Sequence, residues 1–326
     1  MKKNKLMALA VAALMVLTGC GTKSANVSKS SNKKTLNIGI TQIVEHPALD
    51  DARRGFEDGL KELGINANIT YQNAQGEIPN TVTIAQKFVK DKVDLIFAVA
   101  TPAAQSAKQA TKDIPVIFSA VTDPVLAELV DSMEKPGSNV TGTSDASPMD
   151  KQLQIFKDLD SDIEKIGIIY NTGEQNSQIQ VEQAKKISSG LGLEIVESGI
   201  SNINEIPQAV DSIIKKVDGI YTITDNMVAS AINIVAQKAK ENNLITVGAE
   251  DAHVSGGILI SDGISYYELG KQSARMAKEI LVDGNLPAHI PSETSSVTKK
   301  VFNEETRKAL GLDENKKVFE GAEKIQ

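Results

Sequence analysis

Polar side chains gather where short apolar runs end in this chain of 326 residues. The runs are rich in β-branched residues and bounded by turn formers, a pattern typical of strands. At the carboxyl ends of parallel strands, loops and helix N-termini converge on one place, where a small ligand can bind. The candidate binding residues are Gln42, His46, Thr101, Ser119, Thr122, Asp123, Ser144, Asn171, Thr224, Asp225, Asn226 and Asp262.

Three of these candidates could recognise the charged groups of a zwitterion. Thr101 precedes Pro102, which predicts a helix N-cap followed by proline at the first helical position, with free N–H groups that could bind a carboxylate. Asp123 and Asp225 could each accept hydrogen bonds from an ammonium group. The structural alternatives stay open, because Thr101, Asp123 and Asp225 could each cap a helix and His46 could lie on an exposed loop.

Residues for catalysis or metal binding form no recognisable pattern. His253 and His289 lack the spacing of metal ligands, and the chain has no Gly-x-Ser-x-Gly, Walker or dinucleotide-binding motif. We therefore predict a protein that is not an enzyme and that needs no cofactor and no metal.

The N-terminus indicates export. Lysines 2, 3 and 5 precede an apolar run from Leu6 to Leu17, which is shorter than the roughly 20 residues of a bilayer-spanning helix. The run predicts a signal peptide over residues 1–19. Leu-Thr-Gly-Cys then resembles a bacterial lipobox, so Cys20, the only cysteine, is expected to carry a lipid, with a free thiol as the alternative. Residues 20–34 are polar and predict a flexible tether.

Charge and length narrow the function and the domain count. The formal charge is −7, and removal of the three lysines in the signal peptide would leave about −10. Since no block of Lys or Arg follows the tether, binding of nucleic acid is disfavoured. The remaining chain exceeds the usual size of a single core, which predicts two domains with a cleft between them.

Strand-like runs alternate with amphipathic segments of helical period along the rest of the chain, as in βαβ units around parallel sheets. The predicted fold is α/β, with two Rossmann-like lobes that have parallel sheets and are joined by a three-segment hinge. We place residues 35–143 and 258–290 in the N-terminal lobe, and residues 144–257 and 291–326 in the C-terminal lobe.

Several segments resemble the tryptophan/tyrosine-type family of ABC-transporter substrate-binding lipoproteins, and the resemblance covers nearly the whole mature chain. Its motifs lie at predicted strand ends and on one helix. They are residues 39–50 (GITQIVEHPALD), 100–105 (ATPAAQ), 120–124 (AVTDP), 139–145 (NVTGTSD), 224–226 (TDN) and 266–270 (YYELG).

The resemblance implies a type I periplasmic binding fold and a monomer, lipid-anchored outside the cytoplasm, that passes an amino acid to an ABC permease and its ATPase. By analogy, Thr101 and neighbouring amides hold the carboxylate, Asp123 or Asp225 the ammonium group, and Gln42, Asn171 and Asn226 orient them. An aromatic ligand such as tryptophan, phenylalanine or tyrosine would need Phe118, Tyr170, Tyr221 or aliphatic surface as a wall.

The pattern departs from the family at Asp262, where relatives tend to carry an aromatic residue, and at Ser265, where they tend to carry an acid. A different small polar solute is therefore an alternative ligand. A second alternative is a ligand sensor of the same fold that acts on a membrane receptor.

Overall fold

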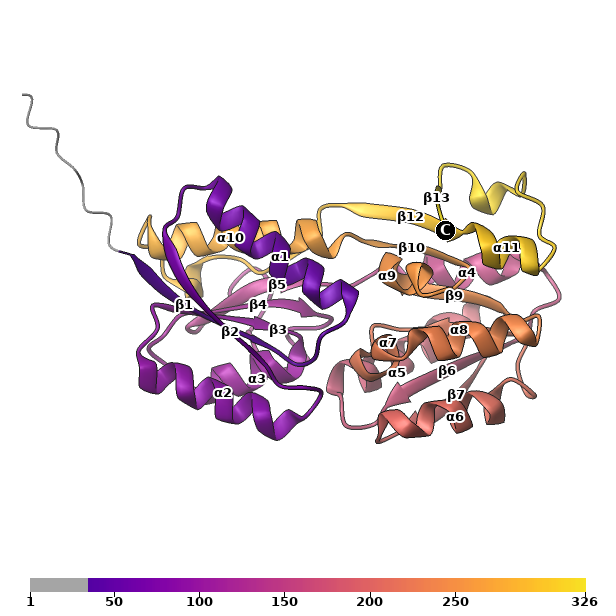
Figure 1. The fold of residues 1–326 in the computed structure, drawn as a ribbon, viewed down its shortest axis with the longest axis horizontal. Helices are drawn as coiled ribbons and strands as arrows, with labels where there is room; N and C mark the ends of the chain where they lie inside the picture. Colours follow the sequence, from indigo (N-terminus) through magenta and orange to yellow (C-terminus); the bar gives the residue numbers. More distant parts are fainter. Residues whose placement is uncertain (1–34) are drawn as a thin grey trace, which may run out of the picture. The chain divides into compact units, whose positions relative to one another are not determined.

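The computed structural model describes residues 35–326, so the predicted signal peptide, Cys20 and the tether lie outside the described residues. The described chain forms two sheets with helices on both faces (Figure 1). None of its helices combines the length and the apolar composition that a bilayer span requires.

The first sheet has the strand order β11-β5-β4-β3-β1-β2, and every neighbouring pair is parallel. Its strands are β1 (Leu36–Gln42), β2 (Ala67–Asn73), β3 (Leu95–Val99), β4 (Val116–Val121), β5 (Val140–Ser144) and β11 (Glu293–Thr294). Its helices are α1 (Pro47–Glu62), α2 (Ile78–Asp91), α3 (Thr101–Ala110) and α10 (Tyr266–Leu281).

The second sheet has the order β13-β12-β10-β9-β8-β6-β7, in which only the β10–β12 pair is antiparallel. Its strands are β6 (Lys165–Asn171), β7 (Glu194–Ile200), β8 (Gly219–Thr222), β9 (Ile245–Glu250), β10 (Ile260–Ile264), β12 (Thr298–Asn303) and β13 (Glu323–Ile325). Its helices are α4 (Met149–Leu159), α5 (Gln175–Gly190), α6 (Ile206–Ile213), α7 (Asn226–Ser230), α8 (Ile232–Glu241), α9 (Asp251–Ser255) and α11 (Glu304–Ala309). The predicted fold of two α/β lobes is confirmed.

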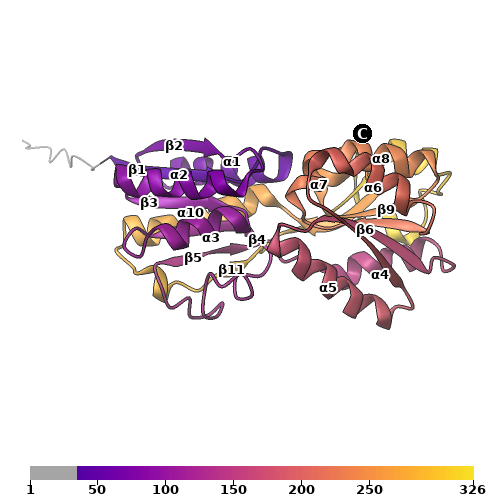
Figure 2. The ribbon, with the colours of Figure 1, turned by 90° about the horizontal axis from the view of Figure 1, so that it is seen from below.

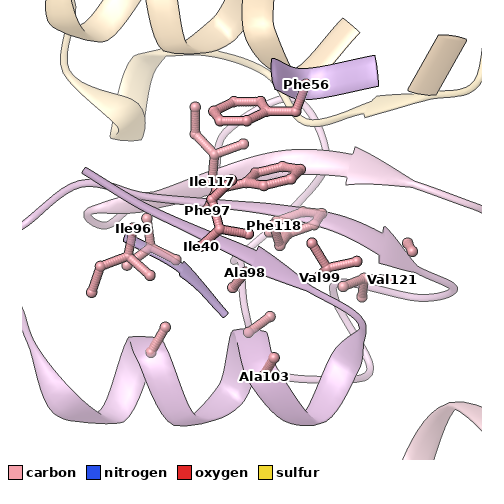
Figure 3. Packing of buried hydrophobic residues seen from close by; sticks show 14 of the residues in the cluster. Ile40, Phe56, Ile96, Phe97, Ala98, Val99, Ala103, Ile117, Phe118 and Val121 are labelled. Carbon is pink, nitrogen blue, oxygen red and sulfur yellow. The ribbon is translucent and has the colours of Figure 1, made fainter. Parts of the chain in front are cut away.

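Both sheets are apolar on both faces, as expected for parallel strands covered by helices. In the first lobe, the ring of Phe56 on α1 stacks on Phe97 of β3, with ring centroids 3.9 Å apart. Figure 3 shows Phe56 on one side of this sheet and Ala103 of α3 on the other. In the second lobe, two separate apolar clusters cover the sheet, one of them with α4 and α5 and the other with α6 and α8.

The chain passes between the two lobes three times, and each passage lies later than its predicted boundary. The first follows β5, within residues 145–148, because Ser144, which was expected in the second lobe, pairs with Thr294 in the first sheet. The second lies at Ser265, because β10 pairs with β9 and β12 and so belongs to the second sheet, whereas residues 258–264 were expected in the first lobe. The third falls in residues 295–297, because β11 pairs with β5 in the first sheet.

Helices α1 and α10 pack at backbone contact, although they are far apart in the sequence. In Figure 2, α10 lies among the elements of the first lobe. A Cβ atom on Gly55 would lie 2.0 Å from the carbonyl oxygen of Tyr267, and one on Gly270 would lie 2.0 Å from that of Ala52. Glycine on both helices therefore permits an approach that fixes His46, which precedes α1, relative to Tyr266, which begins α10.

This packing can be tested with a single methyl group. Gly270→Ala is expected to lower the free energy of unfolding by about 1–3 kcal/mol, because the added Cβ meets backbone atoms that cannot move aside easily. The matched control is Gly190→Ala at the end of α5, where the added Cβ atom would meet no neighbouring residue within 4 Å. That variant is expected to be neutral or more stable by up to about 1 kcal/mol. Urea unfolding of both proteins measures the difference, and equal stabilities would contradict the account.

Candidate ligand-binding site

A cavity of about 260 Å³, including its open mouth, lies between the lobes at the carboxyl ends of strands from both sheets. We call it the inner cavity. Both lobes contribute hydroxyl, amide, imidazole and carboxyl groups to its wall, as a ligand site between domains requires. Its lining residues are His46, Leu49, Ala120, Thr122, Asp145, Asn176, Thr224, Asp225, Asn226, Ala229, Glu250 and Tyr266.

Five of the residues predicted from the sequence line this cavity: His46, Thr122, Thr224, Asp225 and Asn226. Some of them also join the lobes. Nε2 of His46 lies 3.3 Å from Oδ1 of Asn226, and the hydroxyls of Thr122 and Thr224 lie 3.2 Å apart.

Three predicted residues lie behind the cavity wall and brace it. The amide of Gln42 donates to the carbonyl of Val44 and to Oδ1 of Asp50, which holds the segment that leads into α1. The hydroxyl of Ser119 accepts a hydrogen bond from Thr143, and that of Ser144 donates to the carbonyl of Thr122. All three side chains are buried.

Thr101 does not cap α3 as predicted, because the helix begins at Thr101 itself and Ala100 occupies the N-cap position. Ala100 has a φ of 79°, an unfavourable value for a residue with a Cβ, and it offers no side-chain cap. The Thr101 hydroxyl is buried without a hydrogen-bond partner among residues 35–326. It does not line the inner cavity.

Asp123, Asn171 and Asp262 also lie outside the inner cavity. The half-buried Asp123 carboxylate accepts from the N–H groups of Val125 and Leu126, so it caps a turn. Asn171 lines a neighbouring groove. Asp262 lies on β10 opposite Lys300 of β12.

Asp225 serves the structure of the second lobe, although it reaches the cavity. Oδ1 accepts from the N–H of Val228, which caps α7. Oδ2 accepts from the N–H of Asn171 at 2.6 Å and from the hydroxyl of Ser177 at 2.7 Å. Because protein donors already occupy both oxygens, Asp225 is poorly placed to hold a ligand ammonium group.

Four further polar residues line the cavity and were not among the predicted set: Asp145, Asn176, Glu250 and Tyr266. Asp145 directly follows β5 and Glu250 ends β9, so the strand-end pattern applies to both of them. Tyr266 begins α10 two residues after β10, so the same pattern reaches it, whereas Asn176 lies in the first turn of α5, five residues after β6.

The acidic residues of the cavity differ in protonation. Burial raises the pKa of Asp145 to about 6, and hydrogen bonds from Tyr266 and Thr122 oppose that rise. The Tyr266 hydroxyl donates to Oδ2 of Asp145 at 2.8 Å. Burial alone would also raise the pKa of Glu250, but the nearby His253 ring, 2.9 Å away, together with His46 and Tyr266 holds it below its ordinary value.

His46 is a neutral acceptor toward the cavity. Burial lowers its pKa. Asn226 donates through Nδ2 to the carboxyl of Glu174, so its Oδ1 faces His46 and must accept from Nε2. Nδ1 of His46 is therefore a free acceptor. Burial, together with the charge of Asp225, raises the pKa of Glu174 to about 7.

Four buried acceptors on residues of the cavity wall have no hydrogen-bond partner within the described part of the chain. They are Nδ1 of His46, Oδ1 of Asp145, Oδ1 of Asn176 and Oε1 of Glu250, and the last of them lies 2.9 Å from Nε2 of His253. The Asn176 amide is oriented by its Nδ2, which donates to the carbonyl of Thr224. No Lys or Arg lines the cavity. A ligand that presents several N–H groups and a positive charge matches this wall.

The predicted aromatic wall is not part of the cavity. Phe118 is buried in the first core, the Tyr221 hydroxyl donates to Gln152, and Tyr170 packs against the second core. The rings that line the cavity are those of His46 and Tyr266. Among residues 35–326, no group of three or more His, Cys, Asp or Glu side chains is arranged to hold a metal ion.

Comparison with known proteins agrees with this geometry. Residues 37–326 match the family described as ABC transporter substrate binding protein. A tyrosine-binding protein of Clostridioides difficile (strain R20291) is 44% identical over 323 residues, which are 95% of this chain and 93% of that protein.

Two solved structures that are similar to this chain differ in ligand state. An ABC domain from Streptococcus pneumonia in complex with L-Trp is 35% identical and superposes with a TM-score of 0.84, covering 89% of this chain and 100% of that chain. The ligand-free, open structure of a substrate-binding protein with adhesive properties from Clostridium difficile is 44% identical, but its TM-score is 0.69, with 90% and 99% covered.

The family match over residues 37–326, the two-lobed fold and the polar cavity between the lobes lead to one conclusion. The chain belongs to the substrate-binding proteins of ABC transporters.

Proposed function

We propose that this protein binds an aromatic amino acid in the inner cavity, with the ligand ammonium group held by Asp145, Asn176 and His46. The observation that carries the proposal is the set of four unpartnered acceptors, three of them on Asp145, Asn176 and His46, in a cavity lined by carboxyl groups and by no Lys or Arg. An ammonium group offers three N–H donors and the opposite charge, so it would relieve the cost of burying these acceptors.

Asp145 is the ammonium partner in this proposal, in place of Asp123 or Asp225. Asp123 caps a turn outside the cavity, and the oxygens of Asp225 are occupied. Glu250 of the second lobe also lines the cavity and adds negative charge, which further favours a cation.

The ligand carboxylate belongs, in our proposal, near the ends of β3 and β4. Ala100 and Ala120 both have positive φ there, and the register between β4 and β5 shifts between Phe118 and Val121. The N–H of Ala100 still donates to the carbonyl of Ser119, so the donors that we assign to the carboxylate are N–H groups in the first turn of α3, which has no side-chain cap, together with the Thr101 hydroxyl.

The aromatic side chain is supported by the relatives. The 44% identical protein is named for tyrosine, and the 35% identical structure holds L-Trp. Contacts across the cleft would make closure depend on the ligand, since a ligand that touches both lobes favours the closed arrangement.

Export and anchoring complete the proposal. The N-terminal pattern supports cleavage after residue 19, a lipid on Cys20, and a monomer tethered to the outer face of the cell membrane beside its permease and ATPase.

The proposal predicts a specific loss of affinity. Asp145→Asn is expected to weaken L-tyrosine binding by about 10- to 100-fold, because a charge-assisted hydrogen bond becomes a neutral one. Asp123→Asn is the matched control and is expected to bind as the wild type does. Isothermal titration calorimetry gives both values. If the wild type binds no aromatic amino acid, or if Asp145→Asn binds as tightly as the control, the proposal is wrong.

Tyr266 is expected to lower the pKa of Asp145. Its hydroxyl stabilises the ionised carboxylate, so Tyr266→Phe should move the pKa of Asp145 above about 6. Tyr267→Phe is the control, since the Tyr267 hydroxyl donates to Asp58 on α1. An NMR titration of the carboxyl carbons compares the variants. An Asp145 pKa that is the same in both variants would show that Tyr266 has no such role.

A further inference from the structure

A second hollow, of about 930 Å³ including its open mouth, adjoins the inner cavity. We call it the outer groove. The first lobe contributes Ile43, Ile78 and Pro79 to it, and the second lobe contributes Ile203 and Met227. Asn226 lines both hollows, so they are neighbours.

The inner cavity offers little to an aromatic ring. Its volume of about 260 Å³ includes its open mouth, and the space inside holds little more than one water-sized group. Its aliphatic wall consists of Leu49, Ala120 and Ala229, and its other groups are polar or titratable. Such a space suits the charged part of an amino acid better than its side chain.

The outer groove holds the larger aliphatic side chains, beside polar ones such as Glu77, Asn171 and Asn202. Ile78 and Ile203 leave 39% and 43% of their surface exposed, and they come from opposite lobes. Large exposed aliphatic side chains that face one groove indicate a site for an apolar group. A ring placed between them would bury apolar surface of both lobes at once and so stabilise closure.

The contact of His46 Nε2 with Asn226 Oδ1 lies at the boundary between the two hollows, and its 3.3 Å exceeds the usual 2.7–3.2 Å of an N–H···O bond. The Asn226 amide is also held by its Nδ2, which donates to Glu174. Passage of a ring between the hollows therefore requires His46 to move away from Asn226.

We propose that the outer groove is the side-chain compartment of the site: the ligand's charged groups occupy the inner cavity, and its aromatic ring passes His46 and Asn226 to lie between Ile78 and Ile203. This inference rests on the proposed function. In this inference, residues outside the inner cavity make the site specific for amino acids with large apolar side chains.

The test uses two groove variants and two matched controls. Ile78→Ser and Ile203→Ser remove apolar surface from the groove. Ile69→Ser in the first lobe and Ile234→Ser in the second remove isoleucines of similar exposure, 36% and 38%, that do not line it. All four side chains are partly exposed, so the variants are expected to fold, which thermal unfolding checks.

The probe is L-tryptophan, because the chain contains no Trp and the ligand indole is then the only one present. In the wild type, bound L-tryptophan should emit to the blue of free L-tryptophan. Each groove variant should weaken binding by about tenfold or more and shift the bound emission to the red, while the controls change neither. Both readouts are taken at saturating ligand and by titration.

The outcomes separate the two proposals. In one outcome, the wild type binds L-tryptophan and the groove variants match the controls in affinity and emission. That result would overturn the side-chain compartment and leave the proposed function standing. If the wild type binds none of L-tryptophan, L-tyrosine and L-phenylalanine, the proposed function fails first, and the compartment fails with it.

Discussion

The binding site depends on negative charge that is buried between two lobes without a basic residue of the protein to balance it. Asp145, Asp225 and Glu250 all line the inner cavity, and neither Lys nor Arg joins them. Burial of charge is costly unless it is paired or neutralised. The empty site meets this cost in three ways: Asp145 has a pKa near 6, Glu250 pairs with His253, and Asp225 is enclosed by protein donors. A ligand cation would stabilise the ionised form of Asp145, so that the carboxyl no longer needs a raised pKa. Ionisation of Asp145, ligand binding and closure are then linked.

The fold is built so that these groups meet. His46 precedes α1 and Tyr266 begins α10, and the glycine contacts between those helices hold the two ring-bearing residues on one wall. The opposite wall comes from the second sheet, where Asp225 caps α7 and thereby sets the position of Asn226. Contacts such as that between Thr122 and Thr224 then join the walls across the cleft. A small number of backbone constraints thus place side chains that are far apart in the sequence.

The fold class was predictable because its signals are local: strand-like runs alternate with helical periods, and polar turns separate them. The lobe boundaries were less predictable, because the lobe to which β10 belongs depends on its pairing with β9 and β12 and not on its own residues. At the site, the rule of strand ends pointed to His46, Thr224 and Asn226, which line the inner cavity, while their contact with a ligand stays a prediction. The rule could not tell which of the residues at a strand end face the cavity. Successive side chains of a strand point to opposite faces, and Ser119 is buried behind the cavity wall. Nor could it distinguish Asp225 from Asp145, because the difference lies in which backbone N–H groups reach each carboxylate.

The linkage between Asp145 and the ligand cation is tested most directly by counting protons. A bound ammonium group should lower the pKa of Asp145 from its value of about 6 in the empty site, so binding should release a proton from the fraction of molecules in which the carboxyl is still protonated. Calorimetric titration of L-tyrosine in two buffers of different ionisation enthalpy measures that number. The account predicts release of about half a proton per ligand at about pH 6 and almost none at about pH 8. Equal heats in both buffers near pH 6, or uptake of a proton, would contradict it.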